Sequence, residues 1–141
     1  MRYNPWRDVG DRHPDVIILR TDCHPARGAW VSDAQVILLE RTLDRAERNT
    51  VLAHEIAHVD LAHSMTGRKW FDGRQERQAD ALAADRLVDL DDLADALLWA
   101  LCPEEVAEQL DVTVAVVRRR VHALTADQKA YIEARHWGRT A

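Results

Sequence analysis

The stretch VLAHEIAHVD, residues 51–60, places two histidines four positions apart, with a glutamate directly after the first of them. On an α-helix each residue advances by about 100°, so His54 and His58 project from one face, one turn apart, and their imidazoles can share a metal ion. The apolar residues of the stretch point the other way, toward an expected core. Glu55 falls between the two faces, where a carboxylate beside the ion can accept a proton from water. The alternative, a buried helix with two incidental histidines, is costly because each buried imidazole needs a partner.

A catalytic zinc site needs three protein ligands and one open position. His63 is poorly placed as the third ligand, because on a continuous helix it points about 140° away from His58. The better candidate is the segment ERQADALA, residues 76–83, in which Glu76 and Asp80 lie one turn apart. We expect Glu76 to bind the metal and Asp80 to accept a hydrogen bond from the outer nitrogen of a ligand histidine. The alternative for this pair is an ordinary solvated helix face.

The composition favours one globular domain and argues against several classes of partner. The chain has 141 residues, of which 47% are hydrophobic, and its formal net charge is -5. A protein that binds nucleic acid mainly through charge would usually be basic, so we expect no such binding. No apolar run approaches the roughly 18–20 residues of a membrane span, and the polar start lacks the apolar segment of a secretory signal. Two cysteines fit a reducing cytoplasm, where we expect a monomer or small oligomer with no membrane partner.

The pattern of apolar and turn residues predicts an α+β fold, mostly helical with a small antiparallel sheet. We expect a single domain over residues 1–141, built around this metal site. Residues 1–14 are expected to form an irregular arm, residues 15–90 the sheet and the metal-binding helices, and residues 91–141 a helical C-terminal part. The predicted strands are DVIILR (15–20), AWVSD (29–33) and AQVILLE (34–40).

Helical periodicity and capping residues predict the remaining elements. A helix over 43–63 is expected to be capped by Thr42, and one over 74–88 by Asp72. Another helix opens at Asp91 or Asp92. The last three are expected at 103–110, at 114–124, and, after a cap at Thr125, to about residue 137.

The two motifs together resemble a known family. HEIAHVDLAH (54–63) followed by ERQADALAAD (76–85) is similar to the signature of the ImmA/IrrE zinc metallopeptidases, an HExxH helix and then a helix of the form E-x-x-A-[ND]-x-[FL]-A. The resemblance is close over about residues 28–90. Asp80 stands where the family more usually has Asn, which makes the pattern more similar to other gluzincins. RLVDLDD, residues 86–92, replaces the family's usual LLMP after the second helix.

The resemblance implies a gluzincin-like core that holds one Zn²⁺ through His54, His58 and Glu76, with Glu55 as the catalytic base. It implies a zinc-dependent endopeptidase that cleaves a helix-turn-helix transcriptional repressor of a phage, mobile element or stress response. His63 matches a histidine common at the end of this helix in the family. We consider His63 and Trp30 as candidate oxyanion or substrate contacts.

Related zinc peptidases bind substrate as an added strand at a sheet edge, which GAWVSD (28–33) or AQVILLE (34–40) could provide here. Trp30 would then lie beside the substrate. The alternative role for this side chain is packing in the core.

The segment EEVAEQLDVTVAVVRRRVHAL, residues 104–124, resembles a helix-turn-helix. Its three consecutive arginines, residues 118–120, splay about 100° apart and cannot all enter one groove. The preceding helix is acidic and would repel phosphate. We therefore expect a structural helical cap rather than direct DNA binding. The alternative function is a non-catalytic regulatory protein that keeps the metallopeptidase fold and binds a repressor or DNA.

Overall fold

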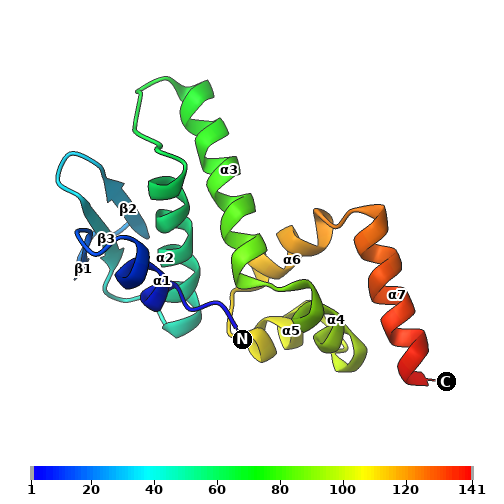
Figure 1. The fold of residues 1–141 in the computed structure, drawn as a ribbon. Helices are drawn as coiled ribbons and strands as arrows, with labels where there is room; N and C mark the ends of the chain where they lie inside the picture. The colour runs from blue at the N-terminus through cyan, green and yellow to red at the C-terminus, as the bar shows by residue number, and fades with distance from the viewer. Residues whose placement is uncertain (1, 141) are drawn as a thin grey trace.

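A small sheet and two long helices lie on one side of the molecule, and a group of further helices lies on the other (Figure 1). The computed structural model describes residues 2–140. In chain order the elements are α1 (Pro5–Arg12), β1 (Ile17–Thr21), β2 (Gly28–Val31), β3 (Val36–Glu40), α2 (Arg45–Asp60), α3 (Lys69–Leu87), α4 (Leu90–Trp99), α5 (Pro103–Leu110), α6 (Val114–His122) and α7 (Ala126–Thr140). The expected α+β class, mostly helical with a small sheet, is confirmed.

The sheet is mixed, so the prediction that it is antiparallel was wrong in one of its two pairings. The strand order is β1-β3-β2, with β1 parallel to β3 and β2 antiparallel to it. The physical reason lies in burial. Ile37 and Leu39 on β3 are fully buried, whereas β1 is mostly exposed. The most apolar strand therefore occupies the centre, and β2 is left as an edge strand.

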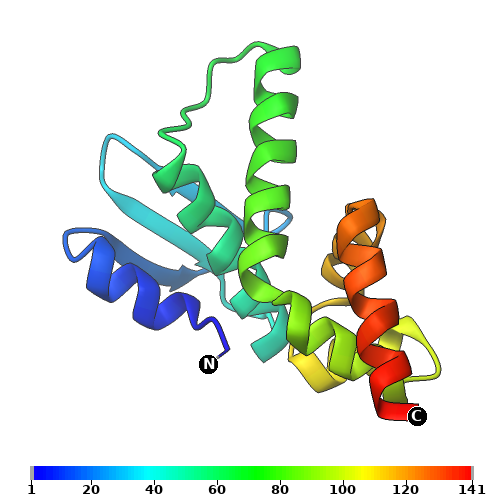
Figure 2. The same ribbon diagram turned by 45° about the vertical axis from the view of Figure 1, so that its right-hand side comes forward.

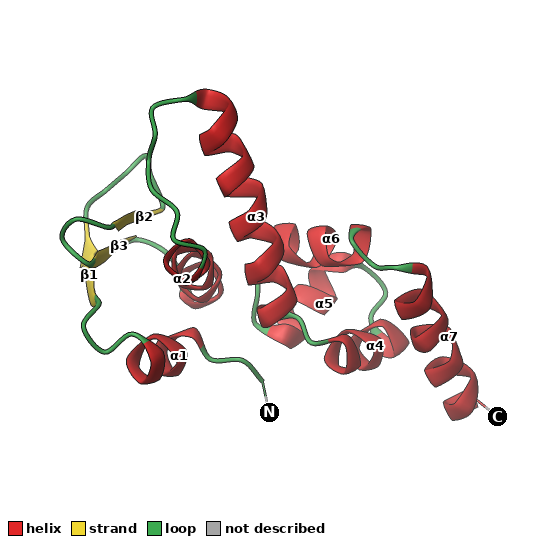
Figure 3. Ribbon diagram, turned by 45° about the horizontal axis from the view of Figure 1, so that its top comes forward, coloured by secondary structure: helices red, strands yellow, loops and turns green. Residues whose placement is uncertain are grey.

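The predicted irregular arm, residues 1–14, was also wrong, because α1 forms within it. The Asn4 side chain accepts hydrogen bonds from the backbone N–H groups of Trp6 and Arg7, and Pro5 occupies the first turn. Both features favour a helix start, because an N-cap side chain satisfies free N–H groups and proline has none to satisfy. Val9 is buried where α1 packs against α2, and the two helices are neighbours in Figure 3.

Both ends of α2 differ from the predicted ones. Asp44, rather than Thr42, caps α2 and forms a capping box with Glu47. The Thr42 side chain instead donates a hydrogen bond to the Glu40 carboxylate. The helix ends at Asp60, three residues before the predicted end.

The later helices follow the prediction more closely. α3 begins at Lys69, five residues earlier than predicted, and Asp72 lies in its first turn. Asp89 caps α4, where Asp91 or Asp92 was expected. The predicted cap at Thr125 is confirmed, because its hydroxyl accepts from the backbone N–H of Gln128.

Two hydrophobic clusters support the two sides of the molecule. One joins the sheet to α2 through Ile37, Leu39, Leu52 and Ile56, and the other lies among α3, α4, α5 and α6. Ala53 of α2 belongs to the second cluster, so α2 contacts both. Within residues 2–140, no helix combines the length and the apolar character that a membrane crossing requires.

Asp60, the last residue of α2, forms ion pairs with residues of α1 and α3. Its carboxylate lies 2.8 Å from Arg12 Nη2 of α1, 2.7 Å from His13 Nε2, and 2.7 Å from Arg86 Nη1 of α3. Burial would raise the Asp60 pKa, but these three partners outweigh it and lower the pKa to about 2. The side chain is only 13% exposed, so solvent screens these pairs weakly.

We expect Asp60→Asn to lower the free energy of unfolding by about 1–3 kcal/mol, because charge-assisted hydrogen bonds to a largely buried carboxylate are lost. Urea denaturation followed by circular dichroism measures the change. Asp33→Asn, in the exposed β2–β3 turn, is the matched control and should change stability little. The folded pKa lies below the usual value of about 4, so the contribution is complete above that pH and is lost as pH falls toward about 2. Equal stability of the two variants at pH 7 would contradict this role.

Candidate metal centre

His54, His58 and Glu76 converge where α2 and α3 run side by side (Figures 1 and 2). Glu76 Oε2 lies 3.0 Å from His54 Nε2, and Glu76 Oε1 lies 2.9 Å from His58 Nε2. The two Nε2 atoms are 3.1 Å apart. One ligand atom from each residue lies within 4.8 Å of the others, which is close enough for one ion to contact all three.

Small residues at the helix contact allow this approach. Ala53 and Ala57 on α2 and Ala79 on α3 are fully buried, and Ala83 is nearly so. Without long side chains between them, the two helix backbones lie close enough for a histidine and a glutamate to meet. The alanines that flank Glu76 and Asp80 in the sequence therefore contribute directly to the geometry of the cluster.

The outer nitrogens of both histidines have partners. His54 Nδ1 lies 2.9 Å from Asp80 Oδ1, an atom that can only accept from it when the carboxylate is ionised. His58 Nδ1 lies 2.9 Å from His63 Nδ1, and His63 Nε2 lies 3.0 Å from Gln78 Oε1. A neutral histidine has one N–H. His63 therefore donates to Gln78 and accepts from His58.

These hydrogen bonds fix which nitrogens are left for a ligand. With Nδ1 of both His54 and His58 acting as donors, their Nε2 lone pairs face each other and the Glu76 carboxylate. Three electron-rich atoms in mutual contact repel one another unless a cation or a shared proton lies among them. The donor set, two imidazoles and one carboxylate, is one that Zn²⁺ accepts. The residues therefore fit a divalent metal ion.

Glu55 lies beside the cluster and is not part of it. Its carboxylate is only 6% exposed, and burial raises its pKa to about 7. Nearby His54 lowers the pKa, Glu76 raises it, and the backbone N–H of Trp30 donates a hydrogen bond to it. A cavity of about 300 Å³ has Glu55, His58, Glu76 and Trp30 in its wall. A carboxylate with a pKa near neutrality, facing a cavity beside a metal site, suits proton transfer.

Gly28 brings the edge strand β2 close to α2. A Cβ at this position would lie 2.6 Å from Val51 Cγ1 and 2.9 Å from the backbone oxygen of Leu38, and 3.4 Å from Glu55 Oε1. Only glycine fits without a shift of the backbone. This contact with a helix distant in sequence could not be predicted from the local sequence pattern.

His63 has a role that the sequence did not assign. The helical-wheel argument assumed that α2 continues to residue 63, but the helix ends at Asp60 and Ala62 adopts a positive φ of 55°. This turn brings the backbone N–H of His63 to the carbonyl of His58, and its ring to the His58 ring. His63 is buried and orients a candidate ligand. Its predicted contact with substrate or oxyanion remains a prediction.

Trp30, the other predicted contact, lies on β2 with its side chain partly buried. It packs against the cluster between the sheet and α2 and also lines the cavity beside Glu55. The two roles considered for it, core packing and contact with a substrate, are thus compatible with its position.

Residues 12–122 match the model of the family described as IrrE N-terminal-like domain, Peptidase_M78. The chain belongs to this family. The expected ImmA/IrrE membership is therefore confirmed, and the match includes both metal-site helices. No curated protein matches the chain strongly enough to count as a relative. Membership in the IrrE-like family supports a metallopeptidase-type fold and gives the cluster on α2 and α3 a chemical context.

In this member of the IrrE-like family, the C-terminal helices contact the candidate metal centre. Arg119 of α6 extends Nη2 to within 3.1 Å of Asp80 Oδ2, and the other oxygen of Asp80 contacts His54. The next residue, Arg120, is buried and donates through Nε to the carbonyl of Val88. Arg118 is exposed. The three consecutive arginines thus point in different directions, as the sequence predicted, and one of them supports the metal site.

We expect Asp80→Ala to weaken Zn²⁺ affinity by about 10–100-fold, because His54 loses the acceptor that orients its ring. Asp80→Asn keeps an oxygen that can accept from His54 and should weaken affinity less. Competition with a chromophoric chelator measures the change without reference to activity. Asp85→Ala, on the exposed face of the same helix, is the control. Unchanged affinity in Asp80→Ala would contradict the orienting role.

Proposed function

We propose that this chain is a zinc-dependent endopeptidase in which His54, His58 and Glu76 hold one Zn²⁺ and Glu55 is the catalytic base. The observation that carries the proposal is the convergence of the three ligand atoms within 4.8 Å, next to the buried carboxylate of Glu55, which lines a cavity together with His58 and Glu76. Membership in a peptidase family supports the reaction class.

The protein's own residues would supply proton transfer and orientation. A Zn²⁺ ion held at this centre would supply Lewis acidity, which polarises a peptide carbonyl and acidifies water. Glu55 would accept the proton of the attacking water and later deliver it to the leaving amine. Its pKa of about 7 suits both steps, because the group can exchange a proton readily near neutral pH. Asp80 and His63 would hold the ligand imidazoles in place through their outer nitrogens.

The edge strand β2 offers a binding place for an extended peptide. Of the two segments considered, AQVILLE forms the central strand β3, whose two sides are already paired, whereas GAWV forms the edge. β2 also lines the cavity beside Glu55 through Gly28, Ala29 and Trp30. A substrate added as a further strand would pass along this cavity, with its backbone satisfying the free edge.

The proposed substrate is a helix-turn-helix repressor of a phage, mobile element or stress response. This part of the proposal rests on the family resemblance alone. Incubation of the purified, zinc-loaded chain with the repressor encoded beside it tests the substrate directly. A discrete cleavage product in mass spectrometry is the expected result. Binding without cleavage would favour the alternative, a non-catalytic regulatory protein that uses the same fold.

The variant Glu55→Gln distinguishes the proposed peptidase from the non-catalytic alternative. The substitution keeps the shape of the side chain but removes its basicity, so we expect proteolysis to fall by about 10²–10⁴-fold. Elemental analysis should still find about one zinc per chain, because Glu55 is not a ligand in the proposed site.

Glu108→Gln, an exposed residue on α5, is the matched control and should cleave normally. If Glu55→Gln cleaves at the rate of this control, Glu55 is not the base. If the metal-free protein cleaves at full rate, the zinc-dependent mechanism is wrong.

A further inference from the structure

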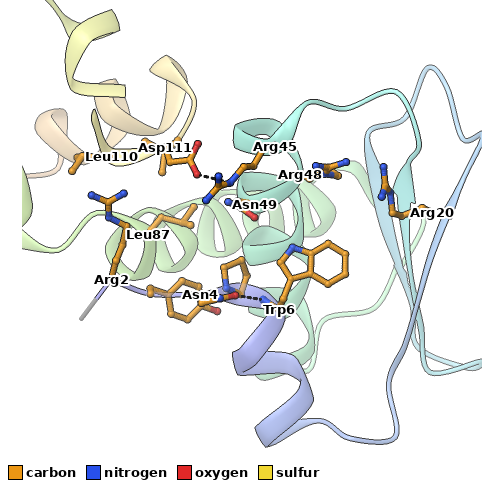
Figure 4. Close-up of a pocket in the computed structure, with 13 residues that line it drawn as sticks. Arg2, Asn4, Trp6, Arg20, Arg45, Arg48, Asn49, Leu87, Leu110 and Asp111 are labelled. Atoms are coloured by element: carbon orange, nitrogen blue, oxygen red, sulfur yellow. Dashed lines mark hydrogen bonds and ion pairs between the residues drawn. The ribbon is translucent and has the colours of Figure 1, made fainter. Parts of the chain in front are cut away.

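A second pocket lies at the start of α2 and shares no residue with the metal centre. It has a volume of about 520 Å³, which lies within the usual range for small-ligand sites. Its walls come from the segment before α1 and the first turn of α1, from β1, from the first turns of α2, from the end of α3, and from the end of α5 and the turn after it (Figure 4). It therefore lies where the two sides of the molecule meet.

The pocket is strongly positive in an acidic protein. Its wall includes four arginines and a single carboxylate, although the chain as a whole carries a net charge of -5. Arg45 pairs with the one carboxylate, Asp111, at 2.9 Å, and Arg2 donates to the carbonyl of Gln109. The other two arginines are Arg20 and Arg48. Neither forms an ion pair or a side-chain hydrogen bond with any residue that the structure describes.

Arg20 and Arg48 come from different elements, β1 and α2, and Figure 4 shows both guanidinium groups at the same end of the pocket. Like charges brought together without carboxylate partners repel each other. An arginine guanidinium presents a planar set of donors that matches two oxygens of one phosphate. A bound phosphate group would satisfy donors from both residues.

Trp6 adds a flat apolar surface to the same pocket. Its side chain is 39% exposed, although burial of a tryptophan is strongly favourable. Nearby Asn49 supplies an amide that can both donate and accept. Phosphate-binding arginines, an accessible indole and an amide are the groups that recognise a phosphate attached to a planar, hydrogen-bonding ring.

We propose that this pocket binds a nucleotide, with its phosphate at Arg20 and Arg48 and its base stacked on Trp6. A free nucleotide fits better than a nucleic acid strand, because the chain as a whole carries a net charge of -5 and would repel a long phosphate backbone. The inference goes beyond the proposed peptidase activity and does not depend on it, since the pocket and the metal centre have no residue in common.

Isothermal titration calorimetry of the purified full chain tests the proposal with four probes: AMP, ATP, inorganic phosphate and a 20-nucleotide single-stranded DNA. We expect AMP or ATP to bind at least about tenfold more tightly than inorganic phosphate, because stacking adds to the phosphate contacts. The double variant Arg20→Gln/Arg48→Gln should weaken nucleotide binding by about tenfold or more, because it removes charged hydrogen bonds to phosphate. Arg118→Gln/Lys129→Gln makes the same change in net charge at exposed positions outside the pocket and should bind like the wild type.

Trp6→Leu tests the contribution of the base separately. We expect this variant to lose the preference for AMP over inorganic phosphate and to bind inorganic phosphate as the wild type does. Circular dichroism verifies that each variant is folded. The nucleotide proposal is overturned if no nucleotide binds at millimolar concentration, or if both double variants bind alike. It is also overturned if Trp6→Leu keeps the preference for AMP, or if the DNA binds more tightly than the nucleotides.

Discussion

The close contact between α2 and α3 is the constraint on which the candidate metal centre depends. Two ligand atoms come from one helix and the third from the other, so their separation is set by the distance between the helix axes. The buried alanines at positions 53, 57, 79 and 83 determine that distance, because larger side chains would force the backbones apart. Asp60 holds the same two helices together beyond the metal residues, through its pair with Arg86. The geometry of the ligand atoms therefore depends on how the core packs between α2 and α3.

Hydrogen bonds to the outer nitrogens of His54 and His58 connect the candidate metal centre to other parts of the molecule. Asp80 links His54 to Arg119 on α6, so the C-terminal helices contact the metal centre through a single carboxylate. His63 and Gln78 support the other histidine from within the α2–α3 pair. The sequence predicted a structural cap for the C-terminal helices, and the Arg119–Asp80 ion pair gives them in addition an electrostatic contact with the candidate site. Displacement of α6 would leave Asp80 with less positive charge nearby and would alter how it holds His54.

The sequence predicted what depends on local periodicity. His54 and His58, and likewise Glu76 and Asp80, lie four residues apart, and a helix places such pairs on one face whatever the rest of the fold does. What it missed depends on contacts between distant segments. The order β1-β3-β2 follows from which strand is most buried, and the closeness of Gly28 to Glu55 follows from the packing of β2 on α2. His63 was misplaced because the helix was assumed to continue past Asp60. Asn4 as an N-cap and the proline after it are residues typical of a helix start, but α1 was not predicted because the segment is largely polar.

The candidate metal centre and the proposed nucleotide pocket lie at opposite ends of α2. His58 lies in the last turn of the helix, where free carbonyl groups make the end negative, whereas Arg45 and Arg48 lie near its first turn, where free N–H groups make the end positive. A metal cation at the C-terminal end of α2 is therefore favoured by the helix itself. Of the two arginines near the N-terminal end, Arg45 is paired with Asp111, whereas Arg48 is disfavoured by the helix dipole. An anion bound at Arg48 would relieve that repulsion. The same helix dipole that would favour a cation beside His58 would thus favour a negative ligand at the other end, so both proposed sites depend on one helix.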